Sequence, residues 1–234
     1  MRISAAILVF SLVSVTPALV MGTPIAQWTF ESTVPTTAGP YSPEVGSGSA
    51  SGFHAGAAVY SSPAGNGSAH SYSSTLWAVG DYWQFQVSTL GFENISISWN
   101  QAGSSTGPRD FILQFSNDGT SFTQVGNAYQ IPPSDWSTTT FHNGFAFNPD
   151  LSGFASLIMN QSDVYFRLVD NSTTAINAGS VSSGGTDRID NLTVTGAQIP
   201  DSTSGLACLV CSVGLLEVLR RMTSVSSPLP QKHA

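Results

Sequence analysis

Apolar and polar residues alternate along most of the central part of the chain. The pattern is clearest at Trp83-Phe85-Val87, Ile95-Ile97-Trp99, Phe111-Leu113-Phe115 and Val164-Phe166-Leu168. Successive side chains of a β-strand point to opposite faces, so this alternation predicts strands with one buried face. No segment of the central region shows a helical period. We therefore expect an all-β domain.

Turns and further strands extend this pattern over residues 23–198. Asp118-Gly119 separates two apolar runs and predicts a hairpin, because glycine accepts the positive φ of a tight turn. Further strands are expected at residues 26–30, 52–60, 138–147 and 188–195. About nine or ten short strands without crossover helices predict an antiparallel two-sheet sandwich of jelly-roll type. A lectin-like or immunoglobulin-like sandwich is the alternative.

The two ends of the chain carry hydrophobic stretches of another kind. Residues 1–22 combine Arg2, an apolar stretch and small residues before Thr23, and they predict a signal peptide. Residues 204–219 are mostly apolar and carry one charge, Glu217, and a helix of this length spans roughly 24 Å of a hydrocarbon core of ~30 Å. We expect a transmembrane helix there, with Arg220 and Arg221 as stop-transfer residues and residues 220–234 as a basic stop and cytoplasmic tail.

A short motif, Ile199-Pro200-Asp201-Ser202, precedes this predicted helix. The order of motif, apolar helix and arginines resembles the sorting signal of exported bacterial PEP-CTERM proteins, in the variant that reads Val-Pro-Asp-Ser. The resemblance covers only the C-terminal end of the chain. It implies that an exosortase-type membrane peptidase cuts near residues 199–203. The mature domain would then leave the inner membrane for the cell envelope or the extracellular space.

The domain at residues 23–198 is acidic and contains no cysteine. It holds twelve carboxylates, three arginines and no lysine, which gives a net charge of −9. Such a surface repels nucleic-acid phosphates and anionic headgroups, so nucleic-acid binding and peripheral membrane binding are excluded as functions. The domain is long enough to bury its own core, and without cysteines it cannot be stabilised by disulfides. Cations, neutral glycans and protein neighbours remain as partners.

A second, looser resemblance concerns the domain itself. Residues 106–111 and 118–122, with Arg188-Ile189-Asp190-Asn191 before the last strand, look like β-sandwich modules of exported bacterial surface proteins. Jelly-roll carbohydrate-binding modules are among the proteins that the chain resembles. The resemblance implies a fold more than an activity.

One aspartate of the last predicted strand is unusually placed. Counting back by twos from Val194 puts Asp190 on the buried side, where an unpaired carboxylate is costly. Ca²⁺ takes oxygen ligands, and the resemblance implies a structural Ca²⁺ between the first and last strands. Asp190 and Glu31 are therefore candidate calcium ligands. The alternatives are an ion pair with Arg188 or Arg167, or a β-bulge in which Asp190 caps backbone amides.

Aromatic residues outside the alternating rows are candidates for stacking on sugar rings. They are Tyr60, Tyr72, Trp77, Tyr82 and Trp136. Packing in the core or at a sheet edge is the alternative for each of them.

Two functions follow from these features. The first is a non-catalytic cell-envelope or extracellular-matrix protein that binds glycan or neighbouring proteins. The second is a secreted polysaccharide hydrolase with acids contributed by loops, such as Asp81, Asp135 or Asp187. Two carboxylates facing each other across an open cleft would favour the hydrolase, whereas a surface lined by aromatic rings and amides would favour binding. The first function is favoured, because no two glutamates lie close enough in the sequence to form a catalytic row.

Overall fold

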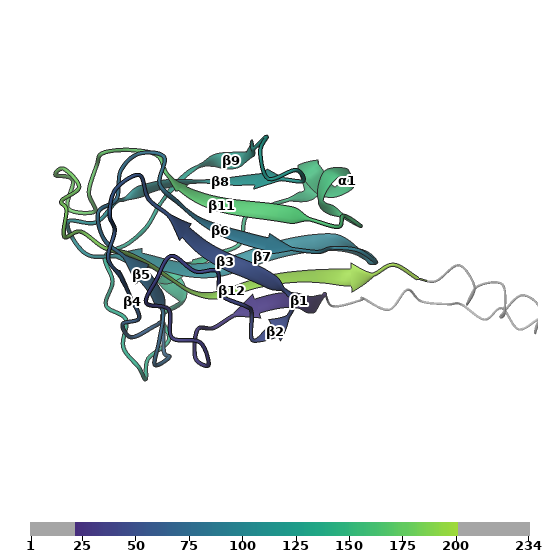
Figure 1. Cartoon of the computed structure of the whole chain (residues 1–234), viewed down its shortest axis with the longest axis horizontal. Coiled ribbons are helices and arrows are strands. Elements are labelled where there is room, and N and C mark those ends of the chain that lie inside the picture. Colours follow the sequence, from purple (N-terminus) through teal and green to yellow (C-terminus); the bar gives the residue numbers. More distant parts are fainter. Residues whose placement is uncertain (1–21, 201–234) are drawn as a thin grey trace, which may run out of the picture.

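The protein is an all-β sandwich of two antiparallel sheets, as the alternation predicts (Figure 1). The computed structural model describes residues 22–200. The first sheet contains β10 (Ala146–Phe147), β7 (Phe92–Gly103), β12 (Asp187–Gln198), β1 (Thr23–Trp28) and β2 (Val45–Gly46), with β5 (Tyr72–Ser74) and β4 (Tyr60–Ser61) attached beside β12. The second sheet contains β3 (Gly48–Phe53), β6 (Tyr82–Val87), β11 (Val164–Asp170), β8 (Asp110–Ser116) and β9 (Thr123–Gln130).

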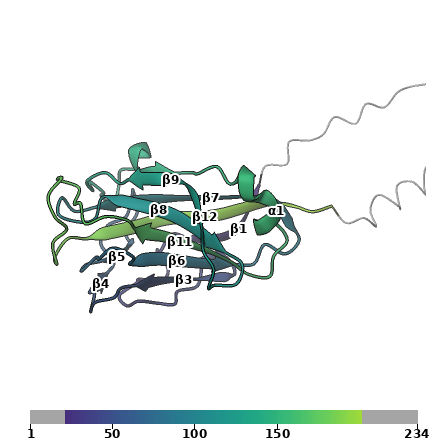
Figure 2. The ribbon, with the colours of Figure 1, turned by 90° about the horizontal axis from the view of Figure 1, so that it is seen from above.

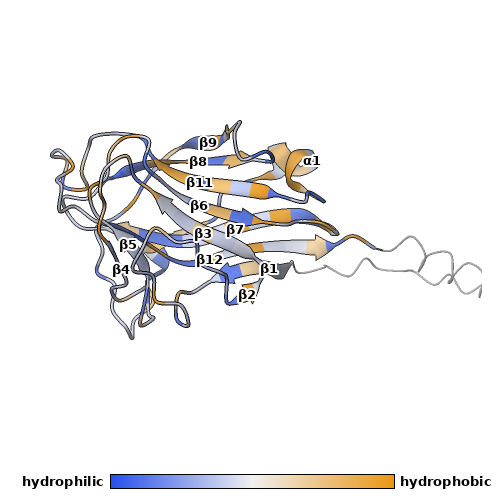
Figure 3. Ribbon diagram, in the orientation of Figure 1, coloured by the Kyte–Doolittle hydropathy of each residue, from blue (hydrophilic) through white to orange (hydrophobic). Residues whose placement is uncertain are grey.

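The core lies between the sheets and is built from the predicted alternating runs. The four runs form β6, β7, β8 and β11, and in β11 every second residue is buried. Figure 3 shows hydrophobic segments on the central strands β8 and β11, while β3 is pale. Burying one large apolar side chain stabilises a fold by roughly 1.5–3 kcal/mol, so these rows supply the main driving force.

The helices are short: η1 (Asn143–Phe145), η2 (Ser152–Phe154) and α1 (Ala155–Ile158). Among residues 22–200, none forms a helix with the length and hydrophobicity needed to span a bilayer. The predicted signal peptide, apart from Gly22, lies outside the described residues, and so do the predicted transmembrane helix, the tail, the arginine pair, and Asp201 and Ser202 of the sorting motif.

Two predicted strands are largely wrong. Of residues 138–147 only Ala146–Phe147 are paired, because the Asn66 side chain binds both the N–H and the C=O of His142 and holds that backbone in a loop. Of residues 52–60 only the two ends are in strands. The chain leaves β3 at His54, whose side chain turns into the core.

A bulge in β12 changes which residues face the core. Asn191 adopts φ 50°, and the pairing with β7 shifts between Asp190 and Thr193. Ile189 and Leu192 are therefore both fully buried although they are three residues apart. Asp190 is fully buried, as the count by twos predicts, but next to this bulge its side chain contacts Asn66 and Ser68 of the loop at residues 65–70.

Both ends of the described chain lie at the same end of the sandwich (Figures 1 and 2). Thr23 of β1 pairs with Gly196 of β12, and the Ile199 N–H donates to the Gly91 carbonyl at 2.8 Å. We call this the proximal end. The loops before β6, after β11 and before β12 lie at the opposite, distal end.

Candidate functional site

The aromatic residues proposed for sugar stacking are mostly buried. Tyr72 has an exposed fraction of 0%, Trp77 of 6% and Trp136 of 8%. Tyr72 packs on Trp83 with ring centroids 4.3 Å apart, and Tyr60 is half-buried beside it. A buried ring offers no free face to a sugar, so the structure places these side chains in the packing role that was the alternative.

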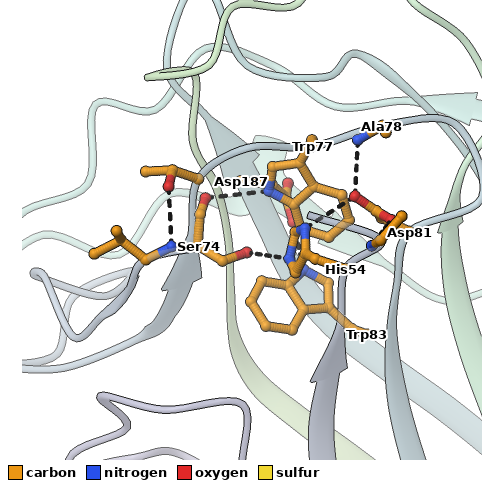
Figure 4. Close-up of polar contacts among 10 residues, drawn as sticks. His54, Ser74, Trp77, Ala78, Asp81, Trp83 and Asp187 are labelled. Atoms are coloured by element: carbon orange, nitrogen blue, oxygen red, sulfur yellow. Dashed lines mark hydrogen bonds and ion pairs between the residues drawn. The ribbon is translucent and has the colours of Figure 1, made fainter. Parts of the chain in front are cut away.

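Trp77 helps to enclose a buried polar cluster that the sequence did not reveal (Figure 4). His54 Nδ1 lies 3.0 Å from Asp81 Oδ2, and His54 Nε2 lies 2.9 Å from Ser74 Oγ. Asp81 also accepts hydrogen bonds from the backbone N–H groups of Ala55 and Ala78. Burial lowers the pKa of His54, and the neighbouring Asp81 opposes that shift.

The cluster has the connectivity of a Ser-His-Asp triad but not its accessibility. The side chains of His54 and Asp81 are 1% exposed, and Ser74 is 0% exposed. The rings of Trp77 and Trp83 pack edge-on against the imidazole, at 4.5 and 6.3 Å between centroids. A nucleophile must reach its substrate, so this cluster orients the loop before β6 rather than performing acyl transfer. The three residues share no sequence motif, and only the fold brings them together.

A second buried carboxyl group, Asp187, lies between the two sheets. Trp83 Nε1 donates to Asp187 Oδ1 at 2.6 Å, and Gln101 Nε2 donates to both carboxyl oxygens at 3.2 and 3.3 Å. The Gln101 side-chain oxygen accepts from Trp99 Nε1 and the Tyr129 hydroxyl. Burial raises the pKa of Asp187 well above its ordinary value.

The acids suggested for a hydrolase do not meet across an open cleft. Asp81 and Asp187 are 1% and 0% exposed and are held by the contacts just described. Asp135 is exposed, 3.8 Å from His142. Glycoside hydrolysis needs two accessible carboxyl groups on either side of the scissile bond, and these three do not provide them.

Asp190 and Glu31 both hold the loop at residues 65–70. Asp190 accepts hydrogen bonds from Asn66 N and Ser68 Oγ at 2.8 and 2.7 Å, and Glu31 accepts from the N–H groups of Ala69 and His70. Burial raises the pKa of Asp190 to about 6, and the nearby Glu31 contributes to the rise.

These contacts match the bulge alternative, in which Asp190 caps backbone amides. Two neighbouring carboxylates with backbone carbonyls close by are also oxygen ligands of the kind that Ca²⁺ binds. Glycine is required at position 65, because a Cβ there would lie 2.3 Å from both Asp190 Oδ2 and the His70 carbonyl oxygen. Within residues 22–200 no group of three or more His, Cys, Asp or Glu side chains is arranged to hold a metal. Calcium binding by Asp190 and Glu31 stays a prediction.

The outer face of the second sheet carries a row of rings around one arginine. The Arg167 guanidinium lies over the Tyr82 ring at 4.0 Å and over the Phe122 ring at 3.5 Å. Phe53, which is half exposed, stacks on Tyr82 with 4.9 Å between centroids and 14° between planes. Arg167 Nε donates to Gln84 Oε1 at 2.8 Å. We call these five residues the Arg167 face.

The register of the strands explains why these residues meet. Tyr82 of β6 lies opposite Phe53 of β3, and Arg167 of β11 lies opposite both Gln84 of β6 and Gln114 of β8. Outward positions of neighbouring strands form continuous rows across a sheet, so aromatic rings and amides are brought side by side. The sequence pointed to Tyr82 alone. Phe53, Phe122 and Arg167 were missed because their contacts cross strands that are far apart in the chain.

Two of the three arginines of the domain, Arg167 and Arg188, form no ion pair with a carboxylate within residues 22–200, and of these two Arg167 lies over aromatic rings. Arg109 pairs with Asp110 at 3.0 Å, and Arg188 is partly buried with a hydrogen bond to the Ala64 carbonyl. Within residues 22–200, Arg167 forms no ion pair with a carboxylate. A guanidinium stays charged at neutral pH and carries five N–H donors, so the Arg167 face can donate hydrogen bonds to a ligand.

Comparison with known proteins shows no family for this chain. No protein-family model matches the chain, and no curated protein matches it in sequence. The CBM22-1-CBM22-2 tandem domain of Paenibacillus barcinonensis Xyn10C is similar over 80% of this chain and 48% of its own length, with 12% identity and a TM-score of 0.47. The chain thus spans about half the length of that tandem.

Two further solved structures are similar to a comparable degree. The K1 cleaved adhesin domain of Lys-gingipain from Porphyromonas gingivalis is 12% identical with a TM-score of 0.42, over 73% of this chain and 96% of that chain. TmCBM61 in complex with beta-1,4-galactotriose is 12% identical with a TM-score of 0.35, over 63% of this chain and 86% of that chain. Similarity at this level does not transfer a ligand to the present chain.

The buried aspartates predict that the domain is more stable in mildly acidic solution. Burial raises the pKa of Asp170 to about 7 and that of Asp190 to about 6, from 3.8. The native state then binds these protons more tightly than the unfolded chain, so the free energy of unfolding decreases as the pH rises from about 4 to about 7. The lowered pKa of His54 opposes this trend, but for one group only.

We expect the Tm at about pH 5.5 to exceed the Tm at about pH 8 in a thermal melt. Asp170→Asn should reduce the part of that difference that lies above about pH 6, and buried Asp187 should keep the rest. A wild-type Tm that increases from the lower to the higher pH would contradict the raised pKa values of Asp170 and Asp190.

Proposed function

We propose that the domain is a non-catalytic binding module of jelly-roll type in the cell envelope or extracellular matrix, and that the Arg167 face contacts glycan. The observation that carries the proposal is the Arg167 guanidinium held between the Tyr82 and Phe122 rings without an acidic partner among residues 22–200. Neighbouring proteins are the alternative partner class, and a secreted polysaccharide hydrolase is the alternative function.

The chemistry of the Arg167 face suits a hydroxyl-rich chain. Aromatic rings offer apolar surface to the C–H groups of a sugar ring, while guanidinium and amide groups bind its hydroxyls. Five strands spaced by about 4.8 Å make the face roughly 20 Å wide, which suits an extended ligand. The acidic character of the rest of the domain makes this arginine a point of attachment for polar or anionic groups.

Removing the guanidinium should weaken polysaccharide binding. We expect Arg167→Ala to raise the dissociation constant about 10-fold or more in affinity electrophoresis, because a charge-assisted hydrogen bond contributes about 1.5–3 kcal/mol. Phe122→Ala should have a smaller effect in the same direction. Suitable probes are xylan and β-1,4-galactan, which are neutral, and xanthan, which is anionic.

Thr193→Ala is the matched control, since Thr193 is a partly exposed β12 residue in the other sheet. The proposal is refuted if no polysaccharide retards the wild-type domain, or if Arg167→Ala and the control behave alike.

We also propose that the chain is exported by its signal peptide and held at the inner membrane by residues 204–219 until an exosortase-type peptidase cuts at residues 199–203. The proposal rests on the sequence motif. It is supported by the position of the last strand, which ends at Gln198, so a cut after it leaves the sandwich whole. The ends of β1 and β12 adjoin at the proximal end, so both proposed cuts would lie at that end of the sandwich.

Mass spectrometry of the native protein tests both processing steps at once. We expect a mature chain that begins at Thr23 and ends within or next to residues 199–203. Recovery of the intact chain from the soluble cytosolic fraction would contradict export and sorting together.

Calcium binding by Asp190 and Glu31 is a further part of the proposed function. An ion between these carboxylates would offset the cost of burying Asp190 and would tie the loop at residues 65–70 to the first and last strands. We expect millimolar Ca²⁺ to raise the Tm of the wild-type domain relative to a chelator, and Glu31→Gln to abolish the difference. A Tm that is the same in calcium and in chelator would remove the hypothesis.

A further inference from the structure

A groove separates the outermost strands of the two sheets, β9 and β10, on a side of the sandwich that the Arg167 face does not include. We call it the β9–β10 groove. Its volume is about 410 Å³, which falls within the ordinary range for small-molecule sites. Its floor consists of the buried side chains of Trp99, Leu113 and Val125. The residues of its two walls are accessible to a ligand, and they carry the argument.

A bulge in β9 brings a polar side chain to the first wall. Residues 126–128 of β9 lie opposite the single residue Ile112 of β8. Gly126 adopts φ 63° in this bulge, a conformation in which a larger residue would be strained. The extra residues of a bulge leave the regular ladder, and Asn127 is exposed here on the wall of the groove.

The second wall is formed by β10 and the residues that follow it. Phe147 of β10 and Tyr129 of β9 are both half-buried, with 4.8 Å between their ring centroids. Asn148 and Asp150 are exposed beside them. Asp150 Oδ1 accepts a hydrogen bond from the Ser152 N–H at 2.8 Å, which lowers the pKa of Asp150 and keeps this group charged at neutral pH.

The polar groups of the walls suit uncharged hydroxyl groups. A side-chain amide both donates and accepts hydrogen bonds, as a hydroxyl does. Within residues 22–200 the side chains of Asn127 and Asn148 have no hydrogen-bond partner, whereas the neighbouring Gln124 and Asp150 do. Asp150 is the one charged residue that lines the groove, and the net charge of −9 on the domain adds to its repulsion of an anionic ligand.

A peptide strand fits this groove less well than a glycan. β9 is the last strand of its sheet, and a strand added to it would need an uninterrupted row of backbone groups. The bulge at residues 126–128 interrupts that row. The Gly126 carbonyl oxygen also accepts a hydrogen bond from Gln124 Nε2 at 2.9 Å.

We propose that the β9–β10 groove binds a neutral glycan, with the amides of Asn127 and Asn148 on its hydroxyls and a sugar ring against Phe147. Asp150 is the only acid among the lining residues, and glycoside hydrolysis uses two, so the groove binds without cleaving. The inference shares the glycan-binding role of the proposed function but not its surface. The two sites select differently, because the Arg167 face carries a positive charge and the groove a negative one.

The test is a titration of ¹⁵N-labelled residues 22–200, which form the whole sandwich, followed by two-dimensional NMR. The neutral probes are cellotetraose, xylotetraose and β-1,4-galactotetraose, and the anionic probe is tetragalacturonic acid. We expect at least one neutral probe to shift the side-chain amide signals of Asn127 and Asn148 and the backbone N–H of Gly126. That probe should bind about 5-fold or more tightly than the anionic one, since a single unit charge near the surface has an effect of this order.

The double variant Asn127→Ala, Asn148→Ala should raise the dissociation constant of that probe about 10-fold or more, because two neutral hydrogen bonds are lost. Asn171→Ala is the matched control, since Asn171 is an exposed asparagine that follows β11 and does not line the groove. Ala146→Trp is a second variant, which fills the groove from an exposed position of β10 and keeps both amides. It should abolish the shifts.

The proposal is overturned if no neutral probe shifts these signals, if the anionic probe binds as tightly, or if the double variant and the control bind alike. Shifts caused by an extended Thr-Val hexapeptide but by no sugar would also overturn it, by identifying the groove as a peptide site. Arg167→Ala should leave the groove shifts unchanged, so failure of the Arg167 face and failure of the groove are distinguishable.

Discussion

The sandwich is organised around a carboxyl group in its core, Asp187. Trp83 comes from the second sheet and Gln101 from the first, and both donate to this group, so one residue joins the two layers. The raised pKa of Asp187 records the cost of burying it. Such a network specifies a unique packing only when its members are satisfied, and Tyr129 and Trp99 complete it by donating to the Gln101 side-chain oxygen.

The polar interior is concentrated toward the distal end, where Asp187 begins β12 and Asp170 ends β11. His54, Asp81 and Ser74 lie under Trp77 and fix the loop before β6. The cluster resembles a catalytic triad in its connections. Its burial assigns it a structural role, and this illustrates why connectivity alone is weak support for catalysis.

The side chains of the Arg167 face that are proposed to bind a ligand lie on the outer face of a sheet whose inner face packs in the core. Tyr82, Gln84 and Arg167 point outward from strands whose alternate residues pack between the sheets. Rigid strands hold such groups with little loss of conformational entropy on binding.

The sequence by itself determined the all-β class, the strands β6, β7, β8 and β11, and the acidic lysine-free surface. Period-two alternation and composition are local properties, and burial of one face follows directly from them. The same alternation places Asp170 at the next inward position after Leu168, so the burial of this aspartate is also predictable from the sequence.

Only the tertiary structure decided which polar and aromatic side chains are exposed to a ligand and which are buried. The count from Val194 predicted that Asp190 is buried, but the bulge at Asn191 and the loop that covers Asp190 could not be read from that count. The burial of Tyr72 and Trp77, and the position of Arg167 between two rings, depend on contacts between strands far apart in the chain. Strand order and register set these contacts, and neither is written in the local pattern of the sequence.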